Sequence, residues 1–153
     1  MQNKVDFLFK SPDDSPGYLL AQLTLLWQRK QKKALDPLGL THTQFVLLSS
    51  IAWLSKDNES VTQVDIASFN NFDRMMVSKV LSTLESKGLI YRQEHSTDTR
   101  AKIVRITSNG KEILQSALSQ VENADIEFFS CLNSSVVPFN LSMLKLISAN
   151  KEE

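Results

Sequence analysis

Apolar residues recur at steps of three and four along much of the chain, which is the spacing of one face of an α-helix. The first such stretch begins at Tyr18, and a polar run follows it over residues 28–33. Asp36-Pro37 should end this helix, because proline cannot continue a helix and restricts the residue before it. The apolar positions that define it are Leu19, Leu20, Leu23, Leu26 and Trp27.

Three further helices are predicted over residues 41–54, 62–69 and 73–88. The first two begin with a capping box, a threonine followed three residues later by Gln44 or Asp65. Asp73 suits the N-cap of the third, and Lys87-Gly88 suits its end. Asn70-Asn71 predicts a tight turn between the last two helices, because asparagine tolerates left-handed backbone.

Beyond Gly88 the apolar period changes to two, as expected of strands. Residues 89–92 and 103–107 flank a polar tip at 95–100, so we expect a β-hairpin. Residues 108–110 (Ser-Asn-Gly) predict a break, after which a long helix runs to about residue 132 and a last one spans about 136–149. The predicted fold class is mostly α-helical with a small β-hairpin.

Composition places the chain among single-domain helical proteins. It has 153 residues, 42% of them hydrophobic, and only four glycines and four prolines. No apolar run approaches the roughly 20 residues that cross a bilayer, and no signal peptide is visible, so we expect a cytoplasmic protein without a membrane partner. A single cysteine agrees with a reducing compartment.

The formal net charge of zero hides an uneven distribution. Residues 74–111 contain eight Lys/Arg against three Asp/Glu, a net charge of +5, whereas residues 112–153 have a net charge of −4. Such a division predicts one segment that faces an anion and another that faces water or a partner.

The predicted order of helix, short helix, turn, helix and hairpin is that of a winged helix-turn-helix. In this arrangement the second helix of the pair enters the DNA major groove, and the hairpin, or wing, reaches the flanking backbone or minor groove. The side chains expected to face double-stranded DNA from this recognition helix are Arg74, Met75, Ser78, Lys79 and Ser82. A packing role for Met75 or Met76 remains an alternative.

At this point the chain resembles the MarR family of transcriptional regulators over nearly its whole length. The matching segments are 39–45, 62–67, 73–92, the wing pattern Asp98-x-Arg100, and residues 104–110. The resemblance implies a bacterial homodimer that binds a pseudo-palindromic operator, most often as a ligand-responsive repressor. It also implies dimerisation helices at 12–38 and 110–153 and a DNA-binding lobe at 41–109.

The wing residues implied to contact DNA are Asp98, Arg100 and Lys102, with Arg100 in the minor groove and Asp98 orienting its guanidinium. A simple ion pair at the turn is the alternative. Family wings often have adjacent arginines where this chain has Ala101, and Arg74-Met75-Met76 is bulkier than usual for a recognition helix. These departures leave the operator sequence unpredicted.

A small-molecule effector could bind between the dimerisation helices and the DNA-binding lobe, as the resemblance allows. Trp27, Phe45 and Trp53 are the candidate lining residues, although aromatic residues at helical spacing are more often core.

The remaining chemistry-bearing residues predict neither an enzyme, a cofactor nor a metal site. His42 and His95 have no carboxylate or cysteine at ligand spacing, and no phosphate loop or nucleophile motif is present. Cys131 lies in an apolar stretch without a neighbouring cation, so a buried structural thiol is expected over a redox sensor. The alternative function is a winged-helix module for protein interaction or oligomerisation, without a DNA target.

Overall fold

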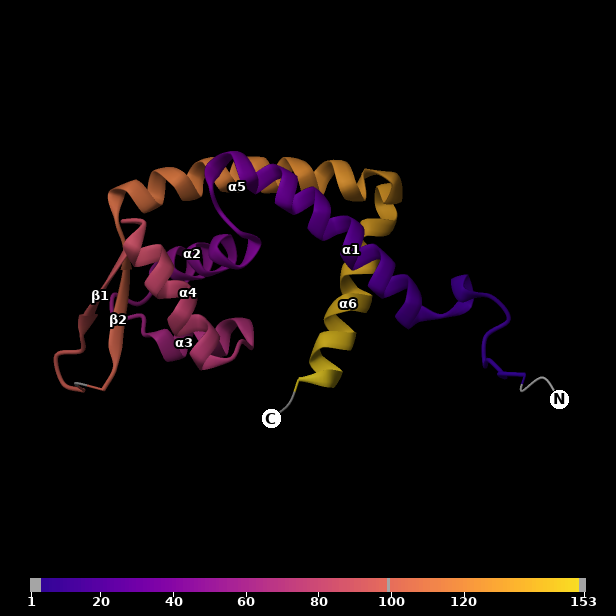
Figure 1. Ribbon diagram of the computed structural model, residues 1–153, viewed down its shortest axis with the longest axis horizontal. Coiled ribbons are helices and arrows are strands. Elements are labelled where there is room, and N and C mark those ends of the chain that lie inside the picture. The colour runs from indigo at the N-terminus through magenta and orange to yellow at the C-terminus, as the bar shows by residue number, and fades with distance from the viewer. Residues whose placement is uncertain (1–3, 99, 152–153) are drawn as a thin grey trace.

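Two long helices cross at the top of the molecule and connect a small lobe to the rest of the chain (Figure 1). The computed structural model describes residues 4–98 and 100–151. The long helices are α1 (Pro16–Leu35) and α5 (Ser108–Phe129), and α6 (Val136–Asn150) descends from the far end of α5. Short 3-10 helices flank them at η1 (Pro12–Asp14), η2 (Asp36–Leu38) and η3 (Ser130–Ser135).

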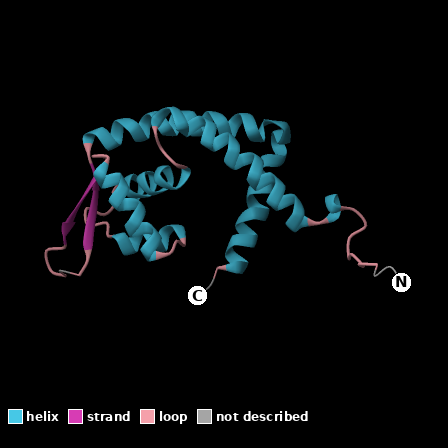
Figure 2. Cartoon of the chain, viewed as in Figure 1, coloured by secondary structure: helices cyan, strands magenta, loops and turns pink. Residues whose placement is uncertain are grey.

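The lobe contains the predicted winged helix-turn-helix, whose strands form the hairpin at one edge (Figure 2). Its elements are α2 (His42–Leu54), α3 (Gln63–Asn70), α4 (Arg74–Ser86), β1 (Ile90–Glu94) and β2 (Lys102–Ile106). The strands are antiparallel, with Ile90 opposite Ile106 and Glu94 opposite Lys102. The predicted fold class is therefore confirmed.

The helix ends agree with the capping signals in the sequence. Thr41 and Thr62 both form complete capping boxes with the residue three positions later. Asn71 adopts the left-handed conformation, with φ 54° and ψ 44°, and so ends α3 and turns the chain toward α4. These local contacts fix the angle at which α4 leaves the turn.

The hydrophobic core lies inside the lobe and continues under α5. Fully enclosed side chains from α2, α3 and α4 interlock there with residues of the hairpin and of α5, among them Leu48, Ile66, Leu81, Val104 and Ala117. The core therefore holds α4 rigidly against α2 and α3.

The break predicted at residues 108–110 is wrong. These residues form the first turn of α5, and Thr107 is its N-cap, with the Gly110 N–H donating to Thr107 Oγ1 at 3.0 Å. The glycine is needed for packing, because a Cβ on Gly110 would overlap the carbonyl oxygen of Leu89. The last helix agrees with the prediction to within one residue.

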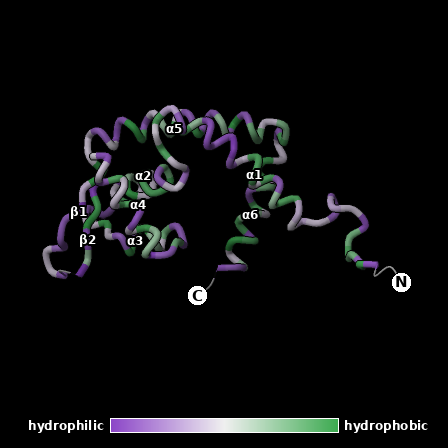
Figure 3. The backbone as a smooth tube through the Cα atoms, viewed as in Figure 1, coloured by the Kyte–Doolittle hydropathy of each residue, from purple (hydrophilic) through white to green (hydrophobic). Residues whose placement is uncertain are grey.

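Helices α1 and α6 expose much of their apolar surface in the single chain. Hydrophobic residues recur along α6 and around the start of α1 (Figure 3). No helix in the described part of the chain is both long and apolar enough to span a membrane. The exposed large apolar residues of the two helices are Tyr18, Leu19, Leu20, Leu23, Leu25, Leu26, Val137, Leu141, Met143, Leu144, Leu146 and Ile147.

Candidate nucleic-acid interface

Helix α4 has one buried face and one open face. The Asp73 carboxylate accepts a hydrogen bond from the Met76 backbone N–H at 2.9 Å, which fixes the first turn. Val77, Leu81 and Leu84 are completely buried against the core. The opposite face of α4 is consequently directed away from the lobe.

The open face bears most of the predicted recognition residues. Arg74, Met75 and Lys79 are exposed, and Ser78 lies half-buried between them. Met75 is 82% exposed, so it takes no part in the core, whereas Met76 packs against the core. The two methionines therefore have different roles, and only Met75 is available to a partner.

Ser82 lies on the same helix, but its hydroxyl is already engaged within the lobe. Ser82 Oγ donates to the Ser78 carbonyl oxygen at 3.0 Å and accepts from Arg92 Nη2 at 2.9 Å. Its contacts hold neighbouring residues in place, which distinguishes it from the four other predicted recognition residues.

Arg92 of β1 joins the wing to α3 and α4. Its guanidinium donates to Gln63 Oε1 at 3.0 Å and to Ser82 Oγ at 2.9 Å, and it forms an ion pair with Glu85 at 3.3 Å. The Arg92 backbone N–H donates to Glu85 Oε2 at 3.0 Å. The hydrogen bond from the Arg92 side chain is the main reason that the pKa of Glu85 lies below its ordinary value.

This positioning role was missed in the sequence, although a signal for it exists. Side chains two apart on a strand share a face, so Arg92 shares the face of the buried Ile90 while Tyr91 points outward. The Arg92 side chain is accordingly only 19% exposed.

Lys87 is a second cation of the basic segment with contacts inside the protein. Its Nζ donates to the carbonyl oxygen of Gly39 at 2.6 Å and to Gln44 Oε1 at 3.1 Å. Lys87 is exposed but hydrogen-bonded within the lobe, and Arg92 is mostly buried, so the +5 charge count overstates the charge that is free to meet a partner. The cations on the open surface of α4 and the wing are Arg74, Lys79, Arg100 and Lys102.

Hydrogen bonds within the turn shape the tip of the wing. His95 Nδ1 accepts from the backbone N–H groups of Thr97 and Asp98 at 3.2 and 3.3 Å. Asp98 Oδ1 accepts from the Arg100 backbone N–H at 3.0 Å, so this carboxylate orients the backbone, where the sequence prediction had it orient the guanidinium. Arg100 and Lys102 are exposed. Thr99 lies outside the described residues.

Of the three candidate effector residues, Phe45 and Trp53 line one groove between α2 and α5. This α2–α5 groove has a volume of about 490 Å³ and includes Ser49, Lys56, Phe69 of α3, and Leu114, Leu118 and Glu122 of α5. The Lys56 ammonium lies 3.9 Å from the centre of the Trp53 ring, a cation–π contact.

Trp27 lies outside this groove and belongs to a junction of α1, α2 and α5. Its Nε1 donates to Asp125 at 2.9 Å, and Gln31 Nε2 donates to the same oxygen at 2.7 Å. The Trp27 ring meets His42 edge to face at a centroid distance of 5.0 Å. Burial lowers the pKa of His42, and the Asp125 charge opposes that shift.

The prediction that Cys131 is buried is wrong. Phe129 packs against both Phe128 and Phe139, with ring-centroid distances of 5.0 and 6.1 Å. Cys131 lies on η3 and is exposed in the single chain, because the apolar neighbours in the sequence turn to other partners. Within residues 4–98 and 100–151, His, Cys, Asp and Glu form no group able to hold a metal ion.

Comparison with known proteins identifies the class to which this lobe belongs. The model of the MarR family matches residues 40–102. A helix-turn-helix transcriptional regulator of Bacillus subtilis (strain 168), YdcH, whose own role is uncharacterised, is 46% identical over 122 residues. That alignment covers 80% of this chain and 83% of YdcH.

Solved structures have the same fold. A cysteine variant of MarR from E. coli, complexed with operator DNA, is 25% identical with a TM-score of 0.78, over 93% of this chain and 99% of that one. CouR from Rhodococcus jostii RHA1, bound to p-coumaroyl-CoA, is 23% identical with a TM-score of 0.79, over 95% of this chain and 99% of that one.

The chain belongs to the MarR family of transcriptional regulators. It is a DNA-binding regulator and not an enzyme, which confirms the predicted class over the protein-interaction module. Regulators of this family act on double-stranded DNA as dimers, so the predicted partners, duplex DNA and a second copy, are confirmed at the level of the family.

Proposed function

We propose that the open face of α4 reads the major groove and that the wing contacts the adjacent minor groove. The observation on which this rests is the exposure of Arg74, Met75 and Lys79 on a helix whose other face is locked into the core. Arginine and lysine can donate to guanine edges or phosphates, and a methionine can contact a thymine methyl. Ser78 adds a hydroxyl to this face, and Ser82 supports it from the next turn.

The wing contributes two cations and a shaped turn. Arg100 enters the minor groove, Lys102 contacts the backbone, and Asp98 fixes the turn through the Arg100 N–H. The DNA-binding lobe is residues 41–109, and the dimerisation parts are 12–38 and 110–153. Two recognition helices in a dimer would meet successive major grooves about 34–36 Å apart, on a pseudo-palindromic operator.

A salt series tests the DNA-contacting residues. Each cation that contacts a phosphate steepens the fall of affinity with salt, so Lys79→Ala and Arg100→Ala should each weaken binding to duplex DNA and reduce the logarithmic slope by about 1. Lys145→Ala, on α6, is the matched control and should leave both unchanged. Equal effects of all three substitutions would place the DNA elsewhere.

We also propose that the protein is a repressor, that it acts in the cytoplasm, and that a small molecule releases it from DNA. The α2–α5 groove supports the effector role, because its size lies within the range of ligand pockets and its lining is aromatic and aliphatic. CouR, which is bound to p-coumaroyl-CoA in its structure, has the same fold. An effector acts by binding one arrangement of the two lobes more tightly than another.

A map of the sites that the protein protects in its source genome would test the repressor role. Protection that overlaps promoters, together with a rise in transcription when the protein is removed, is the expected result. A fall in transcription would identify an activator.

A further inference from the structure

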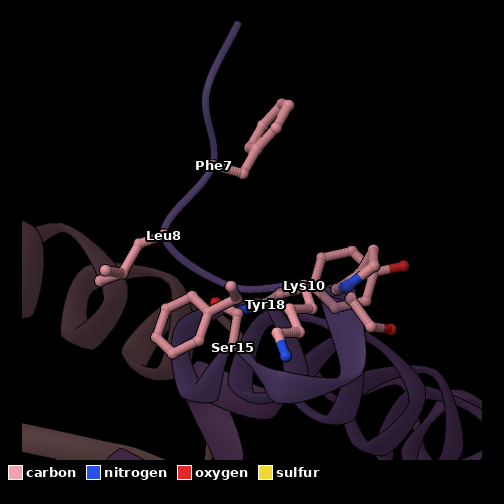
Figure 4. A pocket seen from close by; sticks show the side chains of 8 residues that line it. Phe7, Leu8, Lys10, Ser15 and Tyr18 are labelled. Atoms are coloured by element: carbon pink, nitrogen blue, oxygen red, sulfur yellow. The ribbon is translucent and has the colours of Figure 1, made fainter.

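Residues 4–10, which precede α1, form an arm whose apolar side chains remain largely exposed within the described part of the chain. Phe7 is 82% exposed and Leu8 is 92% exposed. Figure 4 shows Phe7 directed away from the helices and Leu8 directed to the other side of the arm, beside the cup that the arm forms with Ser15 and Tyr18. Exposed apolar clusters of this kind mark interaction sites.

The α2–α5 groove is the matching open apolar surface on the lobe. Trp53 and Phe69 on its walls are 60% and 53% exposed. Ser49 Oγ, also on its wall, is buried and has no hydrogen-bond partner among the described residues. The exposed aromatic walls of the groove can therefore pack against further aromatic side chains.

The arm of one chain does not reach the groove of the same chain. The two lie toward opposite ends of the molecule (Figure 1). Residues 4–10 span at most about 25 Å when extended, by about 3.6 Å per residue. Helix α1, which separates them from the lobe, has 20 residues and is about 30 Å long.

A second copy brings the two surfaces together. In the single chain the N-terminal end of α1 lies on the side away from the lobe (Figure 1), so in a two-fold dimer that pairs α1, α5 and α6 and has its lobes at opposite ends, it would be directed toward the partner's lobe. The arm then continues the dimer interface onto that lobe.

The charges of the arm and the groove are complementary. Asp6 and Lys10 flank the two phenylalanines of the arm. Lys56 and Glu122 flank the aromatic wall of the groove. Residues 8–10 form a bend in the single chain. If the segment extends on docking, Phe7 and Phe9 lie on one side and Asp6 and Lys10 on the other, so both rings can enter the groove while the two charged side chains reach its rims.

We propose that residues 4–10 of each protomer dock into the α2–α5 groove of the partner, with Phe7 and Phe9 against Trp53 and Phe69, Asp6 near Lys56, and Lys10 near Glu122. The unliganded groove is then occupied by a segment of the regulator itself. Any effector of this groove has to displace the arm; that consequence rests on the effector role proposed above, whereas the docking does not.

Disulfide trapping tests the docking directly. In full-length protein with Cys131→Ser, the pair Phe7→Cys and Phe69→Cys should form a covalent dimer under mild oxidation. Each single cysteine, and Phe7→Cys with Ser96→Cys on the wing, are the controls. Covalent dimer no more abundant than in these controls, or a cross-link within one chain, would overturn the proposal.

A charge swap provides a second readout that does not require a cross-link. In a Trp27→Phe background, acrylamide quenching reports only on Trp53. Lys10→Glu should raise the quenching constant, and Glu122→Lys combined with it should restore the original value. Unchanged quenching, or a rise that Glu122→Lys fails to reverse, would contradict the docking. Neither readout involves DNA, so failure of the DNA-contact proposal would leave them unaffected.

Discussion

Arg92 shows how one side chain can determine the position of a whole binding surface. Its guanidinium contacts α3 through Gln63 and α4 through Ser82 and Glu85, while its own backbone belongs to β1. Arg92 thus joins α3 to the two elements proposed to meet DNA, α4 and the wing. Because this cation is mostly buried, it orients the surface without forming part of it.

Arg92→Ala should lower the free energy of unfolding by about 2–3 kcal/mol, because hydrogen bonds to a charged group are lost and Gln63 and Glu85 lose their partner. Urea denaturation measures the change. Arg92→Lys should recover only part of it, since an ammonium cannot reproduce the fork of the guanidinium. If Arg92→Ala lowers the free energy of unfolding by less than about 1 kcal/mol, as expected for an exposed ion pair, the network contributes little to stability.

Glu85 adds a pH dependence to the same network. Its pKa is lowered in the folded state, chiefly by the Arg92 hydrogen bond, so its contribution is full above the ordinary glutamate pKa of about 4.3. The contribution is lost as the pH falls through the lower folded-state pKa. The difference in unfolding free energy between wild type and Glu85→Gln should therefore shrink on acidification, and a constant difference down to pH 3 would contradict this.

At the scale of elements, the first turn of α5 is built around a glycine. Gly110 packs directly on the backbone of Leu89, which lets the helix leave the wing without a gap. Gly110→Ala should destabilise the fold by about 1–3 kcal/mol or more, as overpacking does. Gly17→Ala is the control, because nothing lies within 4 Å of its added Cβ, and it should be neutral or slightly stabilising. Thermal unfolding of both variants tests the difference.

The junction of α1, α2 and α5 should respond to pH through His42. Burial lowers its pKa, so the stability it contributes is full above about 6.5 and decreases as the pH falls below that value. Asp125→Asn keeps an acceptor for Trp27 and Gln31 but removes the charge that raises the His42 pKa. NMR titration in a His95→Gln background should show a further drop in that pKa. An unchanged or higher pKa would mean that the Asp125 charge does not raise the pKa of His42.

Local signals predicted most element boundaries, because capping boxes and the Asn71 turn depend on residues three or four apart. The wrong prediction at residues 108–110 arose from a contact between residues far apart in the sequence. A glycine that usually marks a break serves here to allow close contact with Leu89, a residue about twenty positions away. The prediction that Cys131 is buried was wrong for a similar reason, because tertiary contacts decide its exposure. Its apolar neighbours in the sequence pack on α6 and on each other and leave the thiol exposed.

For the candidate site, helical periodicity correctly separated the open face of α4 from its buried face. It did not separate cations that face outward from those used inside, as Lys87 and Arg92 show. Trp27 and Trp53 likewise have similar sequence surroundings but lie in different places, one hydrogen-bonded at the helix junction and one on the open groove. Such distinctions depend on tertiary contacts.

At the scale of the whole molecule, a single chain leaves a large apolar surface uncovered. Helix α6 has exposed apolar residues along its entire length, and α1 exposes a second set. A surface this apolar is typical of a permanent interface, and in the proposed dimer it would set the separation of the two recognition helices. The dimer interface thus determines which operators the protein can span.

Leu144→Glu should therefore disrupt the dimer, because it places a charge on an apolar face of α6. Sedimentation should show monomers at concentrations at which wild type is dimeric, and the thermal midpoint should lose its dependence on protein concentration. A monomer contacts one half-site, so the salt slope of DNA binding should fall by about half. Asn58→Asp, in the loop before α3, adds the same charge away from α6 and should leave sedimentation unchanged. A Leu144→Glu protein that stays dimeric would remove α6 from the interface and, with it, the geometry on which the cross-subunit arm depends.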